Sequence, residues 1–180
     1  MTKAHKIYLI VASVTTTIAV LVALYFLIYL PNRKTTGMKI VSLKGANFIK
    51  SKEGLELTSY KHEGDVWTIG YGHTLGVTQG MTCTRAQADV WFTQDVKTVE
   101  DFINKQNLSL SQNQFDALVS YAFNIGIGAF GASNLLKLIK SGASESTIRK
   151  WWTTHWVSVQ GTTLTGLVNR RAEEANLFFA

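Results

Sequence analysis

Three side chains in this sequence have types and a spacing that could do hydrolytic chemistry. Glu53 stands directly before a glycine, His62 follows nine positions later, and Thr68 follows six positions after that. Hydrolysis of a glycosidic bond needs a protonated carboxylic acid for the leaving oxygen and a second group that activates water or stabilises the cationic transition state. Glu53 is the candidate acid, and the short β-rich, glycine-containing run after it is typical of a sugar-cleaving cleft.

Two local elements must position these groups. Apolar residues before Glu53 predict a short helix that ends at Gly54, so the carboxyl group lies in its last turn. The negative end of a helix disfavours a charged carboxylate, which suits a group that must hold a proton. Residues 55–71 predict a hairpin. Its turn and second strand would bring three polar side chains near one edge: His62, Asp65 and Thr68.

From residue 84 onward the pattern is helical. Capping boxes at Thr84 and Ser111 each precede apolar residues at helical spacing, and Gly126 and Gly128 end the second helix. Helices are predicted at residues 85–105, 112–124, 135–139, 146–156 and 166–179, with a turn at 160–163. A small hairpin lobe against a larger helical lobe is an α+β arrangement, with the cleft between the lobes.

At three stretches the sequence resembles the phage-type lysozymes of glycoside hydrolase family 24. Their pattern is a glutamate–glycine pair, an aspartate nine positions after the glutamate and a threonine six positions later, so Glu53 and Thr68 are in register. Residues 114–126 resemble the family's central helix, and residues 166–174 resemble its C-terminal segment. The resemblance covers nearly all of the chain after residue 38 and implies a lysozyme-like fold.

The resemblance also implies roles for individual side chains. Arg170 matches an arginine that accompanies the acid, and it would hold and orient Glu53. Thr68 would position the water or the substrate through its hydroxyl group. Asn124 would line the cleft, with a capping role as an equal alternative. No cofactor and no metal is implied, and His73 has no second ligand at metal-ligand spacing.

His62 stands at the position of the family's aspartate and leaves several alternatives open. A neutral imidazole takes a proton from water near neutral pH, so His62 could act as the general base of an inverting mechanism. Glu53 could instead act alone with assistance from the substrate and release anhydro-sugar ends, or hydrolysis could be weak or lost. A shifted turn could also let Asp65 serve as the missing carboxylate, but an aspartate that bonds its own turn backbone is the favoured interpretation.

The first 30 residues predict a membrane anchor. Residues 7–30 form an uncharged run that is long enough to cross a bilayer as a helix. A cleaved signal peptide is the alternative, but the run exceeds the usual apolar region and lacks a small-residue cleavage site before Pro31. The absence of glycine from the run favours firm anchoring over release from the bilayer. Residues 31–38 are expected to form a linker, and residues 39–180 one lysozyme-like domain.

Charge and cysteine content limit other functions. The formal net charge of +6 fits either a solvated basic surface or attraction to an anionic wall polymer. The sequence has no basic cluster beyond short pairs and no nucleic-acid-reading motif, so nucleic acid is not an expected partner. The single cysteine, Cys83, allows no disulfide within the chain.

Together these features predict a membrane-anchored muramidase that degrades peptidoglycan. It would hydrolyse the β-1,4 bond between N-acetylmuramic acid and N-acetylglucosamine. We expect a single pass through the inner membrane and a monomeric catalytic domain on the periplasmic side, where peptidoglycan lies. Its partners would be peptidoglycan glycan strands and the membrane. The alternative is a catalytically degenerate lysozyme domain that binds peptidoglycan or a partner protein, which the change at His62 and the firm anchor would favour.

Overall fold

A computed structural model describes residues 37–61 and 66–180 of the chain. The predicted membrane anchor at residues 1–30 lies outside the described residues, as do most of the linker and two candidate site residues, His62 and Asp65. Within the described ranges, no helix is long and apolar enough to cross a membrane.

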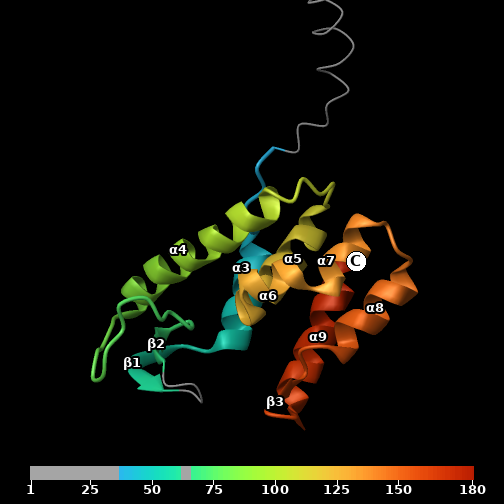
Figure 1. The fold of residues 1–180 in the computed structure, drawn as a ribbon. Coiled ribbons are helices and arrows are strands. Elements are labelled where there is room, and N and C mark those ends of the chain that lie inside the picture. Colours follow the sequence, from blue (N-terminus) through green and yellow to red (C-terminus); the bar gives the residue numbers. More distant parts are fainter. Residues whose placement is uncertain (1–36, 62–65) are drawn as a thin grey trace, which may run out of the picture. The chain divides into compact units, whose positions relative to one another are not determined.

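Helices dominate the described part of the chain, and two small hairpins interrupt them (Figure 1). In chain order the elements are α3 (Leu43–Glu53), β1 (Glu56–Lys61), β2 (Trp67–Gly70), α4 (Arg85–Asn104), α5 (Gln112–Ile125), α6 (Ile127–Ala132), α7 (Asn134–Lys140), α8 (Glu145–Thr154), β3 (Ser158–Val159), β4 (Thr162–Thr163) and α9 (Thr165–Phe178). The β1–β2 hairpin lies beside one end of α4, while α5 to α9 gather beyond its other end. The predicted α+β fold with a small hairpin lobe and a larger helical lobe is confirmed.

The first hairpin is antiparallel and places Tyr60 opposite Thr68. A register shift between Glu56 and Tyr60 bends β1. The chain then returns along the other edge of β1, where the backbone N–H of Ser59 donates to the carbonyl of Met81 at 2.8 Å. β1 is therefore paired on both sides, which fixes the strand that carries Tyr60 toward the site.

The two predicted capping boxes begin α4 and α5. Thr84 Oγ1 accepts from the backbone N–H of Gln87 at 3.2 Å, and the Gln87 side chain accepts from the Thr84 N–H at 2.8 Å. Ser111 and Gln114 repeat this exchange at 3.1 and 2.9 Å. Both helices accordingly start where the sequence predicts, because the caps satisfy backbone donors that have no partner within the helix.

The sequence prediction missed two elements. It treated the stretch with Gly126 and Gly128 as a helix end, whereas α6 begins directly after Gly126 and packs the fully buried Phe130 into the core. It also placed only a turn at residues 160–163, where the structure has the two-residue strands β3 and β4. The predicted helix at 146–156 ends earlier, at Thr154.

Helix α5 is the centre of the core. All eight residues from Phe115 to Ala122 are buried, because α3, α4 and α9 pack around this helix. A helix that is apolar on every side belongs in the interior of a domain. The one acidic residue in this stretch, Asp116, accepts hydrogen bonds from Ser42 at the start of α3 and from Gln112 at the start of α5.

Candidate active site

Helix α3 carries Glu53 as its last residue. Ser42 caps the start of the helix by accepting from the backbone N–H of Gly45 at 3.1 Å. Gly54 ends it with a φ of +74°, a left-handed conformation that favours glycine, and donates its N–H to the carbonyl of Lys50 at 3.1 Å. The local sequence therefore sets where the helix stops and so where the Glu53 carboxyl group lies.

The start of α3 is fixed against α5 through Asp116. This carboxylate is 1% exposed and accepts from the backbone N–H of Ser42 at 3.0 Å and from the Ser42 hydroxyl. Gly45 lies so close that a Cβ atom there would be 2.5 Å from Asp116 Cγ. Because this contact leaves no room for a side chain at Gly45, it limits how closely α3 approaches α5.

Arg170 of α9 reaches Glu53 across the cleft. Its Nη2 lies 2.8 Å from Glu53 Oε1, and the two side chains are only 5% and 18% exposed. The same guanidinium donates from Nε to Glu174 Oε1 at 3.1 Å and from Nη2 to the carbonyl of Ser120 at 3.2 Å. The predicted contact between the candidate acid and the arginine is therefore present in the structure.

One cavity of about 780 Å³ brings together every candidate site residue that the structure describes. The four predicted residues in its wall are Glu53, Thr68, Asn124 and Arg170. The remaining wall comes from the end of α3, the hairpin, the turn after it and the start of α9: Ser51, Lys52, Tyr60, Gly72, Thr74, Leu164, Gly166, Leu167, Asn169 and Glu173. The roles of His62 and Asp65 stay predictions, because both lie outside the described residues.

Thr68 and Asn124 both line the cavity. Thr68 is 8% exposed, and its hydroxyl donates to the carbonyl of Val66 at 3.3 Å, at the long end of hydrogen-bond distances. This hydroxyl can therefore exchange its donor bond for water or substrate at little cost. Asn124 accepts from Arg171 Nη2 through its side-chain oxygen. That bond fixes the amide orientation in the cavity wall.

The structure adds Tyr60 and Gly72 to the site. Burial raises the pKa of the Tyr60 hydroxyl, and the nearby carboxylates of Glu53 and Glu56 raise it further. The tyrosine is therefore a neutral donor in the cavity wall. Gly72 has a φ of +91°, and an added Cβ would lie 3.7 Å from Glu53 Oε2. A strand pattern alone does not tell which face of β1 meets the cleft, so the sequence analysis missed Tyr60.

His73 supports the turn beside the cavity. Its Nδ1 lies 2.8 Å from Asp95 Oδ2, and its ring stacks on Trp91 with centroids 5.0 Å apart. The side chain is 7% exposed. These contacts give His73 a structural role. Across the described ranges, no group of three His, Cys, Asp or Glu side chains could hold a metal ion.

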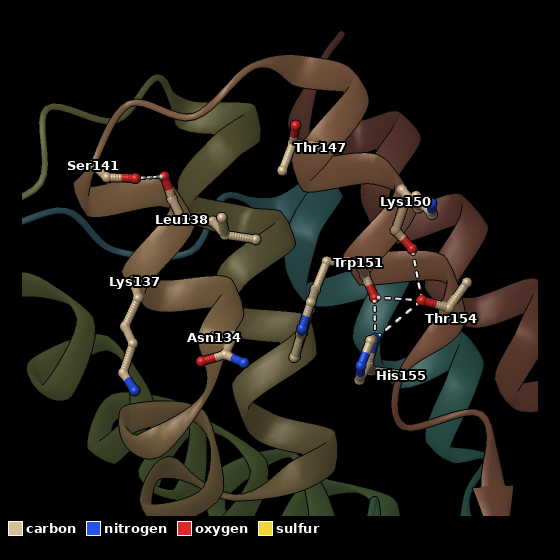
Figure 2. A pocket seen from close by; sticks show the side chains of 9 residues that line it. All are labelled: Asn134, Lys137, Leu138, Ser141, Thr147, Lys150, Trp151, Thr154 and His155. Carbon is tan, nitrogen blue, oxygen red and sulfur yellow. Dashed lines mark hydrogen bonds between the residues drawn. The ribbon is translucent and has the colours of Figure 1, made fainter.

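A second cavity of about 710 Å³ lies between α7 and α8 and shares no lining residue with the first. Figure 2 shows Trp151 between the two helices, with His155 stacked on one face of its ring at a centroid distance of 4.2 Å. Its other polar side chains are amides, hydroxyls and lysines, and the described residues around it contribute no carboxylate. This cavity therefore has no candidate acid.

The first cavity can supply the chemistry of an acid-assisted bond cleavage. Glu53 offers an oxygen to the cavity while Arg170 holds its other oxygen, and the Thr68 hydroxyl lines the same space. Among the described residues, Glu53 Oε1 makes no well-directed hydrogen bond, and its 2.8 Å contact with Arg170 Nη2 orients the carboxyl group. A carboxyl group held in this way is placed to donate a proton to a bound leaving group.

Comparisons with known proteins show which family the chain resembles. The profile of the phage lysozyme family matches residues 50–174. The endolysin of Bacillus phage PZA is 42% identical over 77% of this chain, and the chain spans about half, 54%, of that relative. The endolysin of Acyrthosiphon pisum secondary endosymbiont phage 1 is 40% identical, with 77% of this chain and 97% of the relative covered.

A solved structure and two more distant relatives add to the comparison. The muramidase domain of SpmX from Asticaccaulis excentricus superposes with a TM-score of 0.71 at 36% identity, covering 78% of this chain and 97% of that domain. The relatives from Haemophilus phage HP1 and Enterobacteria phage P21, each 30% identical, are named SAR-endolysins. They cover 76% and 69% of this chain and 80% and 76% of their own lengths.

Proposed function

Because this chain belongs to the phage lysozyme family, we propose that it is a muramidase of the endolysin type that degrades peptidoglycan. The bond cut is the β-1,4 bond between N-acetylmuramic acid and N-acetylglucosamine. The observation that carries the proposal is the Glu53 carboxyl group, paired with Arg170 at 2.8 Å in the wall of a cavity large enough for sugar rings. A cleft of this size with a few convergent polar groups is the usual form of a ligand site.

In this proposal each side chain has one role. Glu53 donates its proton to the leaving glycosidic oxygen. Arg170 orients the carboxyl group through the oxygen that does not donate. Thr68 positions the attacking water or the substrate, and Asn124, which also lines the cavity, contacts the glycan.

His62 is the proposed general base, at the position where the family has an aspartate. Its neutral imidazole accepts a proton from water near neutral pH. Because it carries no negative charge in that state, it does not stabilise a cationic transition state as an aspartate does. We therefore expect slower turnover than a variant with aspartate at this position would have. Asp65, three residues later in the same turn, is the alternative carboxylate.

We further propose that the protein sits in the inner membrane by a single pass, with its catalytic domain on the periplasmic side. Support comes from the uncharged run at residues 7–30 and from the naming of two relatives as SAR-endolysins. In cells whose outer membrane has been opened by osmotic shock, added protease should cut the catalytic domain. In a separate sample without protease, the full chain should stay in the membrane fraction after an alkaline wash. Recovery of the full chain in the soluble fraction would refute the anchor.

Fragment chemistry tests the proposed reaction. The full-length protein is incubated with purified sacculi, and the soluble products are separated and identified by mass. Reducing muramic acid ends are expected. Anhydro-muramic ends would instead indicate that Glu53 acts alone with substrate assistance. Binding to sacculi without fragments would favour the degenerate, wall-binding alternative.

A His62→Asp variant separates the alternatives at the base position. If His62 takes the aspartate's place, this variant should cleave sacculi faster than the wild type, because a carboxylate adds charge stabilisation of the transition state. An Asp65→Asn variant serves as its counterpart in the same turn. A loss of cleavage in Asp65→Asn together with an unchanged rate in His62→Asp would transfer the role to Asp65.

A further inference from the structure

Glu174 is a buried carboxylate one helical turn after Arg170, with 0% of its surface exposed. Its Oε1 accepts from the Ser120 hydroxyl at 2.7 Å and from Arg170 Nε at 3.1 Å. Its Oε2 lies 3.2 Å from Arg171 Nη1 and accepts from Trp152 Nε1 at 3.3 Å. A buried charge persists only when it is paired and hydrogen-bonded, and here three helices supply the partners. The position of this carboxylate is therefore tightly fixed.

Arg170 is shared between two carboxylates. Its Nη2 contacts Glu53 in the cavity wall, and its Nε contacts Glu174 in the core. Arg171 adds a second cation and is itself 0% exposed. Without Glu174, the buried charge of Arg170 beside Glu53 would have no counter-charge on its core side, and the buried charge of Arg171 would add to it. Positive charges of this kind favour the ionised form of a carboxyl group. Glu174 cancels one of these charges.

On the premise of the proposed muramidase activity, we propose that Glu174 is a positioning residue for the acid. It fixes the guanidinium of Arg170 and balances its charge, so that Arg170 orients Glu53 without presenting an uncompensated buried cation to it. A lone arginine would both orient a carboxyl group and promote loss of its proton. The counter-charge of Glu174 keeps the first effect and weakens the second.

The other charged and titratable groups around Glu53 and Arg170 do not replace Glu174 as a counter-charge to Arg170. Those that the structure describes are Lys52 from α3, Tyr60 from β1, Tyr121 from α5, and Arg171 and Glu173 from α9. Lys52 and Glu173 pair with each other at 2.6 Å on the rim. Burial raises the pKa of the Tyr121 hydroxyl, so that residue is neutral where the enzyme would work. Glu174 is therefore the counter-charge on the core side of Arg170.

The test is the pH profile of sacculus cleavage by the full-length Glu174→Gln variant. The substitution keeps the shape of the side chain and removes its charge. The alkaline limb, where the acid loses its proton, should move to lower pH by about one unit or more, since a nearby charge has effects of this size. A merely structural role would lower the rate at every pH and leave the limb in place, and that result would overturn the proposal.

Two further variants provide matched controls. Glu145→Gln makes the same chemical change in an exposed ion pair with Arg149 on α8 and should leave the limb unmoved. Glu174→Asp keeps the charge and should restore most of the wild-type profile. A limb that moves equally in Glu145→Gln and Glu174→Gln would mean that net charge alone is responsible, which would refute the positioning role.

If Glu174→Gln does not fold, the Arg171→Met variant tests the charge-balancing role of Glu174 instead. It removes one cation and leaves Glu174 bonded to Arg170, Ser120 and Trp152, so the alkaline limb should move to higher pH. An unmoved limb would overturn the proposal.

The failure of this inference is distinguishable from failure of the proposed function. If the wild-type protein releases no fragments from sacculi, the muramidase proposal fails first. If the wild type cleaves, Glu53→Gln does not, and the limb stays unmoved in both Glu174→Gln and Arg171→Met, only the role of Glu174 is refuted.

Discussion

Gly45→Ala should destabilise the protein, although glycine to alanine normally strengthens a helix. Alanine is favoured over glycine inside a helix by about 1 kcal/mol. At Gly45, however, the new Cβ would lie 2.5 Å from Asp116 Cγ and 2.8 Å from Asp116 Oδ2, closer than such atoms can approach. Asp116 cannot turn aside without losing its bonds to Ser42 and Gln112. The clash therefore outweighs the gain in helix propensity.

The magnitude follows from these two costs. Overpacking of a tight core contact costs about 1–3 kcal/mol. Loss of a hydrogen bond to a charged group costs a further ~1.5–3 kcal/mol. After the propensity gain is subtracted, Gly45→Ala should lower the free energy of unfolding by roughly 1.5–5 kcal/mol. Since α3 carries Glu53, the same displacement should also reduce cleavage of sacculi.

Urea unfolding of the full-length protein measures this effect, with Gly128→Ala as the matched control. Gly128 lies in α6, and an added Cβ there would meet no atom within 4 Å. The control should be neutral or stabilising by up to about 1 kcal/mol. If Gly45→Ala proves as stable as Gly128→Ala, the contact between α3 and α5 does not limit the approach of the two helices and the reasoning is wrong.

Three further changes have defined outcomes. Thr84→Ala removes the cap of α4 and should lower the free energy of unfolding by about 1 kcal/mol; an unchanged urea midpoint would show that the capping box contributes nothing. Trp152→Phe deletes a donor to the buried Glu174 and should cost about 1.5–3 kcal/mol, measured in the same way and contradicted by wild-type stability. Because burial raises the pKa of Tyr121, the folded state keeps a proton that the unfolded chain loses above about pH 10, so stability should fall there by up to ~1.4 kcal/mol per pH unit. Tyr121→Phe should remove this part of the loss of stability. If the free energy of unfolding fell equally steeply at alkaline pH in both proteins, the prediction would be refuted.

Much of the helical lobe is predictable because its signals are local. Thr84 and Ser111 start their helices through bonds to residues three positions away, which the sequence displays directly. Helix α6 was missed because its glycines lower helix propensity, and the compensation comes from burial of Phe130 against distant residues. The β3–β4 hairpin was missed because its strands are only two residues long.

The candidate site was predictable in its outline through the family resemblance, which put Glu53 and Arg170 together. Glu174 was missed for a physical reason. A glutamate one turn after an arginine on a helix normally indicates a solvated ion pair, and only the folded chain brings Ser120 and Trp152 over it. The contribution of His62 stays a prediction.

The most direct test of the central claim is the rate at which full-length Glu53→Gln releases fragments from sacculi, compared with Glu145→Gln. Loss of a general acid should slow the reaction by about 100- to 10,000-fold. Glu145 pairs with Arg149 at 2.6 Å, outside both described cavities, and its variant should cleave at the wild-type rate. A Glu53→Gln protein that keeps the wild-type rate would contradict the assignment of the acid and, with it, the proposed mechanism.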